Sequence, residues 1–244
     1  MAGRLAAAAG TCLLRGRARR AAWMAHDALW LYPTLRRNCN WHGEVVTRMD
    51  TTAREVWLTI DDGPDAHDTP LFLELLAQYD ARATFFAIGR KAEQHRDLCR
   101  RIYAEGHDLG NHTFSHPAPF WWVLPRPMVR QEIERAQEVL LAATGLLPRW
   151  FRSPVGMNTP GVHPAAALLG LRVIGWSADG ADGGCPSAPT QIVSRIMSKV
   201  QPGSIILLHE SGGRKHRALT LARLLERLKE EGYRCVLPAP DSLC

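Results

Sequence analysis

From about residue 56 onward, short β-rich runs alternate with longer stretches of helical periodicity. Such alternation is typical of βα units built around a largely parallel sheet. The strand candidates are Val56–Ile60, Ala83–Ile88, Asp108–Asn111, Trp150–Arg152, Leu171–Trp176, Ser204–Leu208 and Tyr233–Leu237. The sequence therefore predicts an α/β fold with about seven parallel strands, a count that suits a barrel.

Between these strands, apolar residues recur at the three- or four-residue spacing of a helix. The helix candidates are Thr69–Tyr79, Lys91–Glu105, Met128–Thr144, His163–Leu169, Thr190–Val200 and Leu219–Glu231. Residues 1–52 show no such alternation. We therefore divide the chain into a basic N-terminal extension, residues 1–52, and one folded domain, residues 53–244.

Composition and charge limit the possible partners. The chain has 244 residues, of which 46% are hydrophobic and 22% charged, as in an ordinary globular protein. Its formal net charge of +6 is concentrated before the first strand candidate, so the excess lines no groove of the folded domain, and we expect no nucleic-acid partner. The arginines that carry most of this charge are Arg4, Arg15, Arg17, Arg19, Arg20, Arg36 and Arg37.

The extension begins with an apolar run, Leu5–Leu14, that is far shorter than the ~20 residues that span a bilayer. Arginines follow this run where a secretory signal would have a neutral cleavage site. We therefore expect a cytoplasmic or membrane-associated protein without a transmembrane helix. Trp23 and Trp30 leave two interpretations open: a basic segment on a membrane surface, or a peripheral helix.

Candidate catalytic residues follow the predicted strands. In parallel α/β folds, reactive groups gather where strands end and loops begin. The first strand runs into Asp61 and Asp62. Two adjacent carboxylates repel each other and need a cation or an arginine nearby to stay ionised.

A pair of histidines follows the third strand candidate. His112 and His116 are four residues apart, so a helical turn would place both imidazoles on one side, able to bind one ion. Asp62 is the obvious third ligand. Two histidines and one carboxylate form the three-ligand set of a catalytic metal that keeps a position open for water.

Three later strands also end in polar residues. Arg152 ends the fourth, Asp179 and Asp182 follow the strand that carries Trp176, and His209 follows Leu208. A lone histidine after an apolar run is usually structural. Here an acidic residue, an arginine or a histidine lies at the end of several predicted strands, which favours one shared active site instead.

Taken in order, these residues resemble the motifs of the polysaccharide deacetylase family, the NodB homology domain of carbohydrate esterase family four. Thr59–Gly63 is similar to the family's T-F-D-D-G, and His112–His116 to its H-[ST]-x-x-H. Arg152–Pro154 resembles R-x-P, Asp179–Asp182 resembles D-x-x-D, and Leu207–His209 resembles L-x-H. The similarity covers about residues 54–240, and five ordered motifs are far more specific than any one.

The resemblance implies a distorted (β/α) barrel and a hydrolase of carbon–nitrogen bonds other than peptide bonds, which removes N-acetyl groups from a polysaccharide, an oligosaccharide or a lipid-linked sugar. Asp62, His112 and His116 would hold a divalent ion, with Zn²⁺ expected, that polarises the acetyl carbonyl and activates water. Asp61 would be the general base, and His209 would protonate the leaving amine.

The resemblance also implies supporting groups. Arg152 would tether the base and Asp182 would orient the imidazole, although Asp179 remains an alternative. The backbone N–H of Val155 would donate to the oxyanion. We also assign substrate contacts to Pro154 and Trp176.

This chain departs from the family pattern at aromatic positions. Val155 and Gly183 stand where the family often has aromatic residues, so the substrate need not be a long chitin-like polymer. Phe120, Trp121 and Trp122 either restore apolar surface or serve ordinary loop packing. Two other functions stay open: an O-acetyl carbohydrate esterase and a non-catalytic carbohydrate-binding scaffold.

Overall fold

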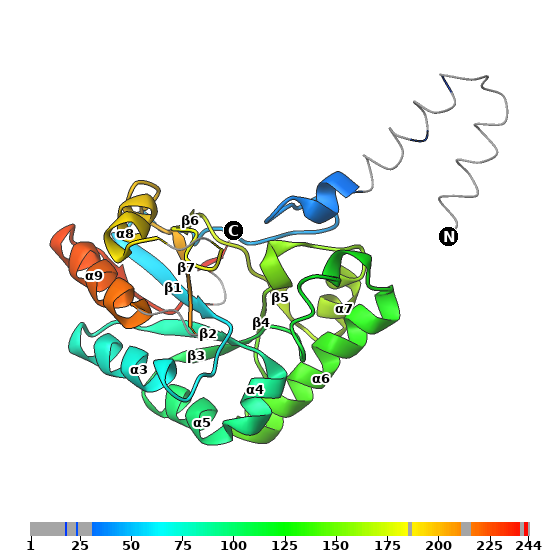
Figure 1. The fold of residues 1–244 in the computed structure, drawn as a ribbon, viewed down its shortest axis with the longest axis horizontal. Helices are drawn as coiled ribbons and strands as arrows, with labels where there is room; N and C mark the ends of the chain where they lie inside the picture. Colours follow the sequence, from blue (N-terminus) through cyan, green and yellow to red (C-terminus); the bar gives the residue numbers. More distant parts are fainter. Residues whose placement is uncertain are drawn as a thin grey trace.

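The computed structural model describes residues 31–184, 187–210, 216–239 and 242–243, together with Ala18 and Trp23. A single curled sheet of parallel strands forms its centre (Figure 1). The strands are β1 (Glu55–Asp61), β2 (Ala83–Ala87), β3 (Asp108–Asn111), β4 (Trp150–Phe151), β5 (Arg172–Val173), β6 (Ala178–Asp179), β7 (Ile205–His209) and β8 (Arg234–Cys235). Their order is β5-β4-β3-β2-β1-β7-β6, and β8 pairs with the start of β1.

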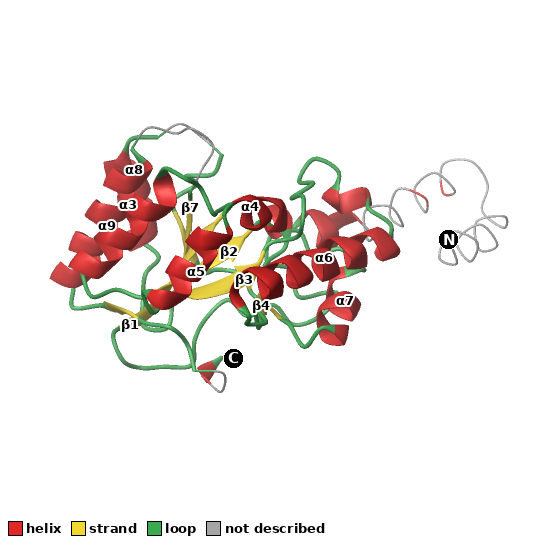
Figure 2. Ribbon diagram, turned by 90° about the horizontal axis from the view of Figure 1, so that it is seen from below, coloured by secondary structure: helices red, strands yellow, loops and turns green. Residues whose placement is uncertain are grey.

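Helices surround the curled sheet, as Figure 1 and Figure 2 show from two sides. They are α3 (Asp68–Gln78), α4 (Gly89–Gln94), α5 (Arg96–Ala104), α6 (Arg126–Thr144), α7 (Val162–Leu168), α8 (Pro189–Met197) and α9 (Arg217–Glu230), with short 3₁₀ turns at Trp121–Val123 and Pro154–Gly156. The single helix predicted over Lys91–Glu105 is wrong: α4 and α5 meet at His95, whose φ of −128° and ψ of 52° end the first helix.

The sheet is an incomplete barrel, which confirms the predicted distorted (β/α) architecture. Within the described residues, no pairing joins β5 to β6. Residues 46–49 run beside this opening: Val46 bridges to Ile174, and Arg48 bridges to Ser204. Val46 is 1% exposed and belongs to the core. The segment before β1 thus contributes to the barrel, a role that its sequence did not indicate, while the division of the chain at residue 52 stays a prediction.

Strand alternation decides which side chains face the barrel interior. In β1, Leu58 and Ile60 pack with the helices in the largest hydrophobic cluster. Thr59 and Asp61 therefore point the other way, into the barrel. In the β1–β7 register Asp61 lies opposite His209, so both side chains reach the same end of the interior.

Among the described residues, none of the helices has the length and apolarity needed to cross a lipid bilayer. The predicted membrane-surface segment depends on Trp30 and on arginines before it, which lie outside the described residues. Contact with a membrane stays a prediction.

Candidate active site

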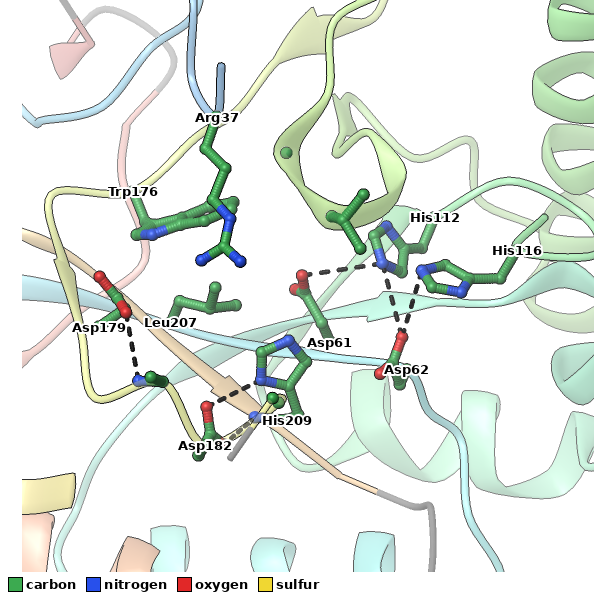
Figure 3. A pocket seen from close by; sticks show the side chains of 15 residues that line it. Arg37, Asp61, Asp62, His112, His116, Trp176, Asp179, Asp182, Leu207 and His209 are labelled. Carbon is green, nitrogen blue, oxygen red and sulfur yellow. Dashed lines mark hydrogen bonds and ion pairs between the residues drawn. The ribbon is translucent and has the colours of Figure 1, made fainter. Parts of the chain in front are cut away.

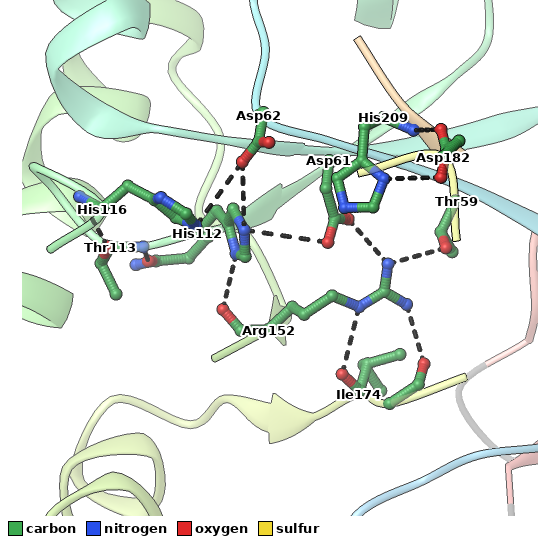
Figure 4. Close-up of polar contacts among 12 residues, drawn as sticks. Thr59, Asp61, Asp62, His112, Thr113, His116, Arg152, Ile174, Asp182 and His209 are labelled. Carbon is green, nitrogen blue, oxygen red and sulfur yellow. Dashed lines mark hydrogen bonds and ion pairs between the residues drawn. The ribbon is translucent and has the colours of Figure 1, made fainter. Parts of the chain in front are cut away.

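Asp61 and Arg152 form a buried ion pair at the centre of the site (Figure 4). The Arg152 Nη1 donates hydrogen bonds of 2.7 Å to Asp61 Oδ1 and to Thr59 Oγ1. The rest of the guanidinium donates to the carbonyl oxygens of Ile174 and Gly175, at 3.3 and 2.8 Å. Arg152 and Asp61 are only 1% and 3% exposed. The Arg152 guanidinium therefore fixes the position of the Asp61 carboxyl group.

Asp62, His112 and His116 bring three potential metal ligands together. Their ligand atoms lie within 4.8 Å of one another. The Nε2 atoms of the two histidines are 3.6 and 3.5 Å from Asp62 Oδ1. His112 Nδ1 is 2.8 Å from the Arg152 carbonyl oxygen, a contact that directs Nε2 toward the site. Two imidazole nitrogens and one carboxylate are a donor set that fits a divalent ion such as Zn²⁺.

The histidine pair is held by a loop, so the helical turn predicted for His112–His116 is wrong. Thr113 and His116 adopt positive φ values of 66° and 52°, which no helix contains. The Asn111 side chain accepts a hydrogen bond from the Thr113 N–H, and Thr113 Oγ1 accepts one from the His116 N–H. These local bonds turn the backbone back on itself, and the two imidazole centroids come within 4.7 Å.

The electrostatics of this cluster suit metal binding. Burial, followed by the nearby His112, lowers the pKa of His116 to about 4, so its imidazole is neutral near pH 7. Burial acts to raise the pKa of Asp62, but the surrounding histidines and Lys91 outweigh it and the net shift is downward. A neutral imidazole and an ionised carboxylate are the protonation states that bind a cation.

His209 is paired with Asp182. Its Nδ1 lies 2.9 Å from Asp182 Oδ1, and its backbone N–H donates to Asp182 Oδ2 at 2.8 Å. Burial acts to lower the pKa of His209, but the hydrogen bond and charge of Asp182 outweigh it, so the pKa is raised. Asp179 instead pairs with Lys199 at 2.9 Å. In this structure the residue beside His209 is therefore Asp182.

The Asp62–His112–His116 cluster and the His209–Asp182 pair border one cavity of about 330 Å³ (Figure 3). This cavity is large enough for part of a sugar chain. Val155, which is 40% exposed, and Trp176 line its wall. Pro154 is buried beside Val155 and does not line the cavity. The lining residues are Arg37, Asp61, Asp62, His112, His116, Val155, Gly156, Trp176, Asp179, Ala181, Asp182, Gly183, Gly184, Leu207 and His209.

The aromatic residues after the histidine motif do not line this cavity. Trp121 is fully buried and donates a hydrogen bond to the Met157 carbonyl, so it serves packing. Phe120 and Trp122 are 66% and 42% exposed on the same loop. Gly183 lies against the His209 ring, where an added Cβ would come within 2.8 Å of the imidazole. A bulky side chain at that position requires the ring to move.

Glu210 is a supporting residue that sequence reasoning missed. It is fully buried, and its N–H donates to the Asp61 carbonyl oxygen at 3.0 Å. Thr69 Oγ1 donates to its carboxyl group at 2.5 Å. A Cβ at Gly63 would lie 1.5 Å from Glu210 Oε1, so only glycine fits beside it. Burial raises the pKa of Glu210 to about 8. An acidic residue directly after a buried strand was the available signal.

A second missed residue is Arg37, whose side chain lines the cavity although it precedes β1 by many residues. Nothing in the local sequence marks it, because the extension has no hydrophobic periodicity. Its position depends on long-range backbone contacts with the loop around Gly156.

A barrel that gathers these acids and histidines at the carboxyl ends of its strands belongs to the large class of α/β enzymes with a site at that edge. Comparison with known proteins narrows this class. The family model for polysaccharide deacetylases matches residues 48–174, and the chain belongs to that family.

Individual relatives agree with this assignment. A chitooligosaccharide deacetylase of Sinorhizobium fredii is 35% identical, over 77% of this chain and 92% of that protein. A peptidoglycan-N-acetylglucosamine deacetylase of Bacillus cereus is 31% identical, over 83% of this chain and 94% of that protein. Among solved structures, a mutant of a Bacillus anthracis protein, described as a CE4 family pseudoenzyme with restored enzymatic activity, has a TM-score of 0.70 and 30% identity. That alignment covers 78% of this chain and 67% of the other.

Proposed function

We propose that this protein is a metal-dependent hydrolase that removes N-acetyl groups from a carbohydrate. The observation that carries the proposal is the convergence of Asp62, His112 and His116 at one wall of a cavity. Asp61 and His209, from neighbouring strands, border the same cavity. The deacetylase relatives support the substrate class.

Asp62, His112 and His116 would hold the ion, and Zn²⁺ suits their two nitrogens and one oxygen. A divalent ion supplies Lewis acidity, which polarises a carbonyl and lowers the pKa of water. The position of the triad beside Asp61 means that this chemistry and the base would act on the same acetamido group.

Asp61 is the proposed general base. Its carboxylate is held in place by Arg152 at 2.7 Å, which leaves the other oxygen, Oδ2, on the side of His112, at 3.7 Å from Nε2. This oxygen would accept the proton of the attacking water. Arg152 fixes the orientation of the base before that transfer.

His209 is the proposed general acid. An amine leaves a tetrahedral intermediate poorly unless its nitrogen is protonated. Asp182 holds Nδ1 of the ring, so Nε2 is the atom available to the cavity and would deliver the proton as the C–N bond breaks. The raised pKa of His209 favours the protonated form required of an acid.

The substrate wall consists of Val155 and Trp176. Val155 has a positive φ of 50°, and it is 40% exposed at the cavity. We assign its backbone N–H to the developing oxyanion, and the Trp176 ring to the apolar face of a sugar. Pro154 would act through Val155, as a buried residue that fixes the turn.

Acetate release from N-acetylated oligosaccharides tests the proposal. The protein is assayed on chitooligosaccharides and peptidoglycan fragments, before and after chelation, and again after Zn²⁺ is restored. We expect acetate release that chelation abolishes and Zn²⁺ restores. Release that is unaffected by complete metal removal would refute metal dependence, and turnover of O-acetyl esters alone would favour the esterase alternative.

The pseudoenzyme among the structural relatives gives the scaffold alternative a concrete form. In this chain Asp61, Asp62, His112, His116 and His209 are all present and all border one cavity. A binding protein needs neither a base nor an acid. Sugar binding without acetate release from any acetylated substrate would establish the scaffold.

A further inference from the structure

Arg37 lies at the rim of the catalytic cavity, contributed by the segment that precedes the barrel. Its backbone is fixed there: it bridges to Met157, and the following residue, Asn38, donates its N–H to the Gly156 carbonyl at 3.0 Å. The Asn38 side chain also donates to the Trp176 carbonyl at 2.9 Å. These contacts hold the segment around Arg37 against Gly156, Met157 and Trp176 beside the cavity.

The Arg37 side chain projects into the cavity. Figure 3 shows its guanidinium beside the Trp176 ring, directed toward the space above Asp61 and His209. Arg37 is exposed, so a ligand in the cavity can reach it. Its neighbour Arg36 differs: that guanidinium lies 5.6 Å from the Tyr32 ring and donates to the Tyr32 hydroxyl, and it does not line the cavity.

The charge of Arg37 is available to a ligand. Among the described residues, no carboxylate lies within ion-pair distance of Arg37. Asp179, which borders the same cavity, pairs with Lys199, and Arg37 is the last and smallest of the influences that lower the pKa of Asp179. Arg37 is also the only lysine or arginine among the described lining residues, where four carboxylates are present. Each of those carboxylates has a basic partner of its own: Arg152 for Asp61, the histidine pair for Asp62, Lys199 for Asp179 and His209 for Asp182.

We propose that Arg37 determines substrate specificity by binding an anionic group, a carboxylate or a phosphate, on the N-acetylated carbohydrate. The planar guanidinium offers parallel N–H donors that match the oxygen pairs of either group. The reacting acetamido group lies at the metal triad, and the anionic group occupies the Trp176 side of the cavity. This inference rests on the proposed function and narrows its substrate class to acidic sugars.

The test compares matched substrates. Acetate release is measured on a neutral N-acetylglucosamine oligosaccharide, on the same oligosaccharide joined to a uronic acid, and on its 1-phosphate. The proteins are the wild type, Arg37→Ala, Arg37→Lys and Arg37→Glu, with Arg36→Ala as the control outside the cavity. The uronic acid and the phosphate distinguish the two sources of negative charge.

We expect the wild type to prefer one acidic substrate over the neutral one. Arg37→Ala is expected to lower kcat/KM on that substrate about 10- to 100-fold, the range for loss of a charge-assisted hydrogen bond. The neutral substrate should change little. Arg37→Glu should favour the neutral substrate, Arg37→Lys should fall between wild type and Arg37→Ala, and Arg36→Ala should match the wild type.

A binding measurement separates this inference from the proposed activity. Calorimetry of the same oligosaccharides against the Asp61→Asn variant, with and without Arg37→Ala, needs no turnover. A loss of affinity confined to the acidic oligosaccharide supports the role of Arg37 even if acetate is never released. Two results would overturn the role of Arg37. One is a ratio of acidic to neutral affinities that Arg37→Ala leaves unchanged; the other is the same affinity for the acidic and the neutral oligosaccharide when Arg37 is present.

Discussion

Asp61 and Asp62 are neighbours in the sequence but face different regions of the site. Asp61 is 3% exposed, ends β1 and is bound by Arg152. Asp62 leaves the strand with a positive φ of 74°, and its side chain, 28% exposed, turns to the two histidines. Asp62 lies just beyond the strand, where the positive φ turns the backbone, so its side chain does not follow the alternation of β1. This difference matches the roles proposed above, proton transfer for Asp61 and metal binding for Asp62.

Substitution of His209 tests its proposed role as the general acid. We expect His209→Gln to lower kcat on an N-acetyl substrate by about 10²- to 10⁴-fold, because the amine then leaves without a proton. An O-acetyl ester has a better leaving group and should lose much less. Parallel assays on matched amide and ester sugars measure this difference. Equal losses on both substrates would mean that His209 is not the acid for the leaving group.

Substitution of Arg152 tests whether its ion pair with Asp61 stabilises the fold. Arg152→Met leaves a buried carboxylate without its cation, a change that typically costs ~3–5 kcal/mol of unfolding free energy. The double variant Arg152→Met with Asp61→Asn should recover part of that loss, since no charge remains buried. Urea denaturation of the four proteins gives the coupling. A double variant no more stable than Arg152→Met would contradict the assigned pair.

Glu210 contacts the backbone on both sides of Asp62. Its N–H donates to the Asp61 carbonyl oxygen, and its side chain lies against Gly63. Burial raises its pKa from 4.5 to about 8. Between these values the unfolded chain loses the proton while the folded protein keeps it, so this contribution to stability is complete below pH 4.5 and is lost as the pH rises through 8.

Glu210→Gln has no such proton to lose. Its unfolding free energy should therefore fall less steeply with pH than that of the wild type, by up to ~1.4 kcal/mol per pH unit in this interval. Denaturation at pH 5, about 6.5 and 8 measures the slopes. Glu226→Gln, an exposed change on α9, is the control. Identical slopes for wild type and Glu210→Gln would show that Glu210 is ionised in the folded protein.

The sequence predicted most of the barrel because its strands carry strong apolar runs. Asp61, Arg152 and His209 could be placed at strand ends for the same reason. β6, with only Ala178 and Asp179, has no apolar run and was missed. The helical turn predicted at His112–His116 is wrong because the Asn111 and Thr113 side chains accept hydrogen bonds from backbone N–H groups, which competes with helix formation.

Residues positioned by distant contacts were beyond sequence reasoning. Arg37 reaches the cavity only because its backbone pairs with Met157, far along the chain. Whether Asp179 or Asp182 supports His209 also depended on three-dimensional contacts, since Lys199 of the segment after α8 binds Asp179. Local patterns predict which strand end a residue follows, but not the partners that it meets across the barrel.

The most direct test of the division between Asp61 and Asp62 is the metal content of two variants. Asp61→Asn and Asp62→Asn are purified, loaded with Zn²⁺, dialysed and measured by mass spectrometry alongside the wild type. We expect the wild type and Asp61→Asn each to retain one ion per chain. Asp62→Asn should lose the ion. Retention of the ion by Asp62→Asn, or its loss from Asp61→Asn alone, would contradict the assignment of one carboxylate to the metal and the other to the proton.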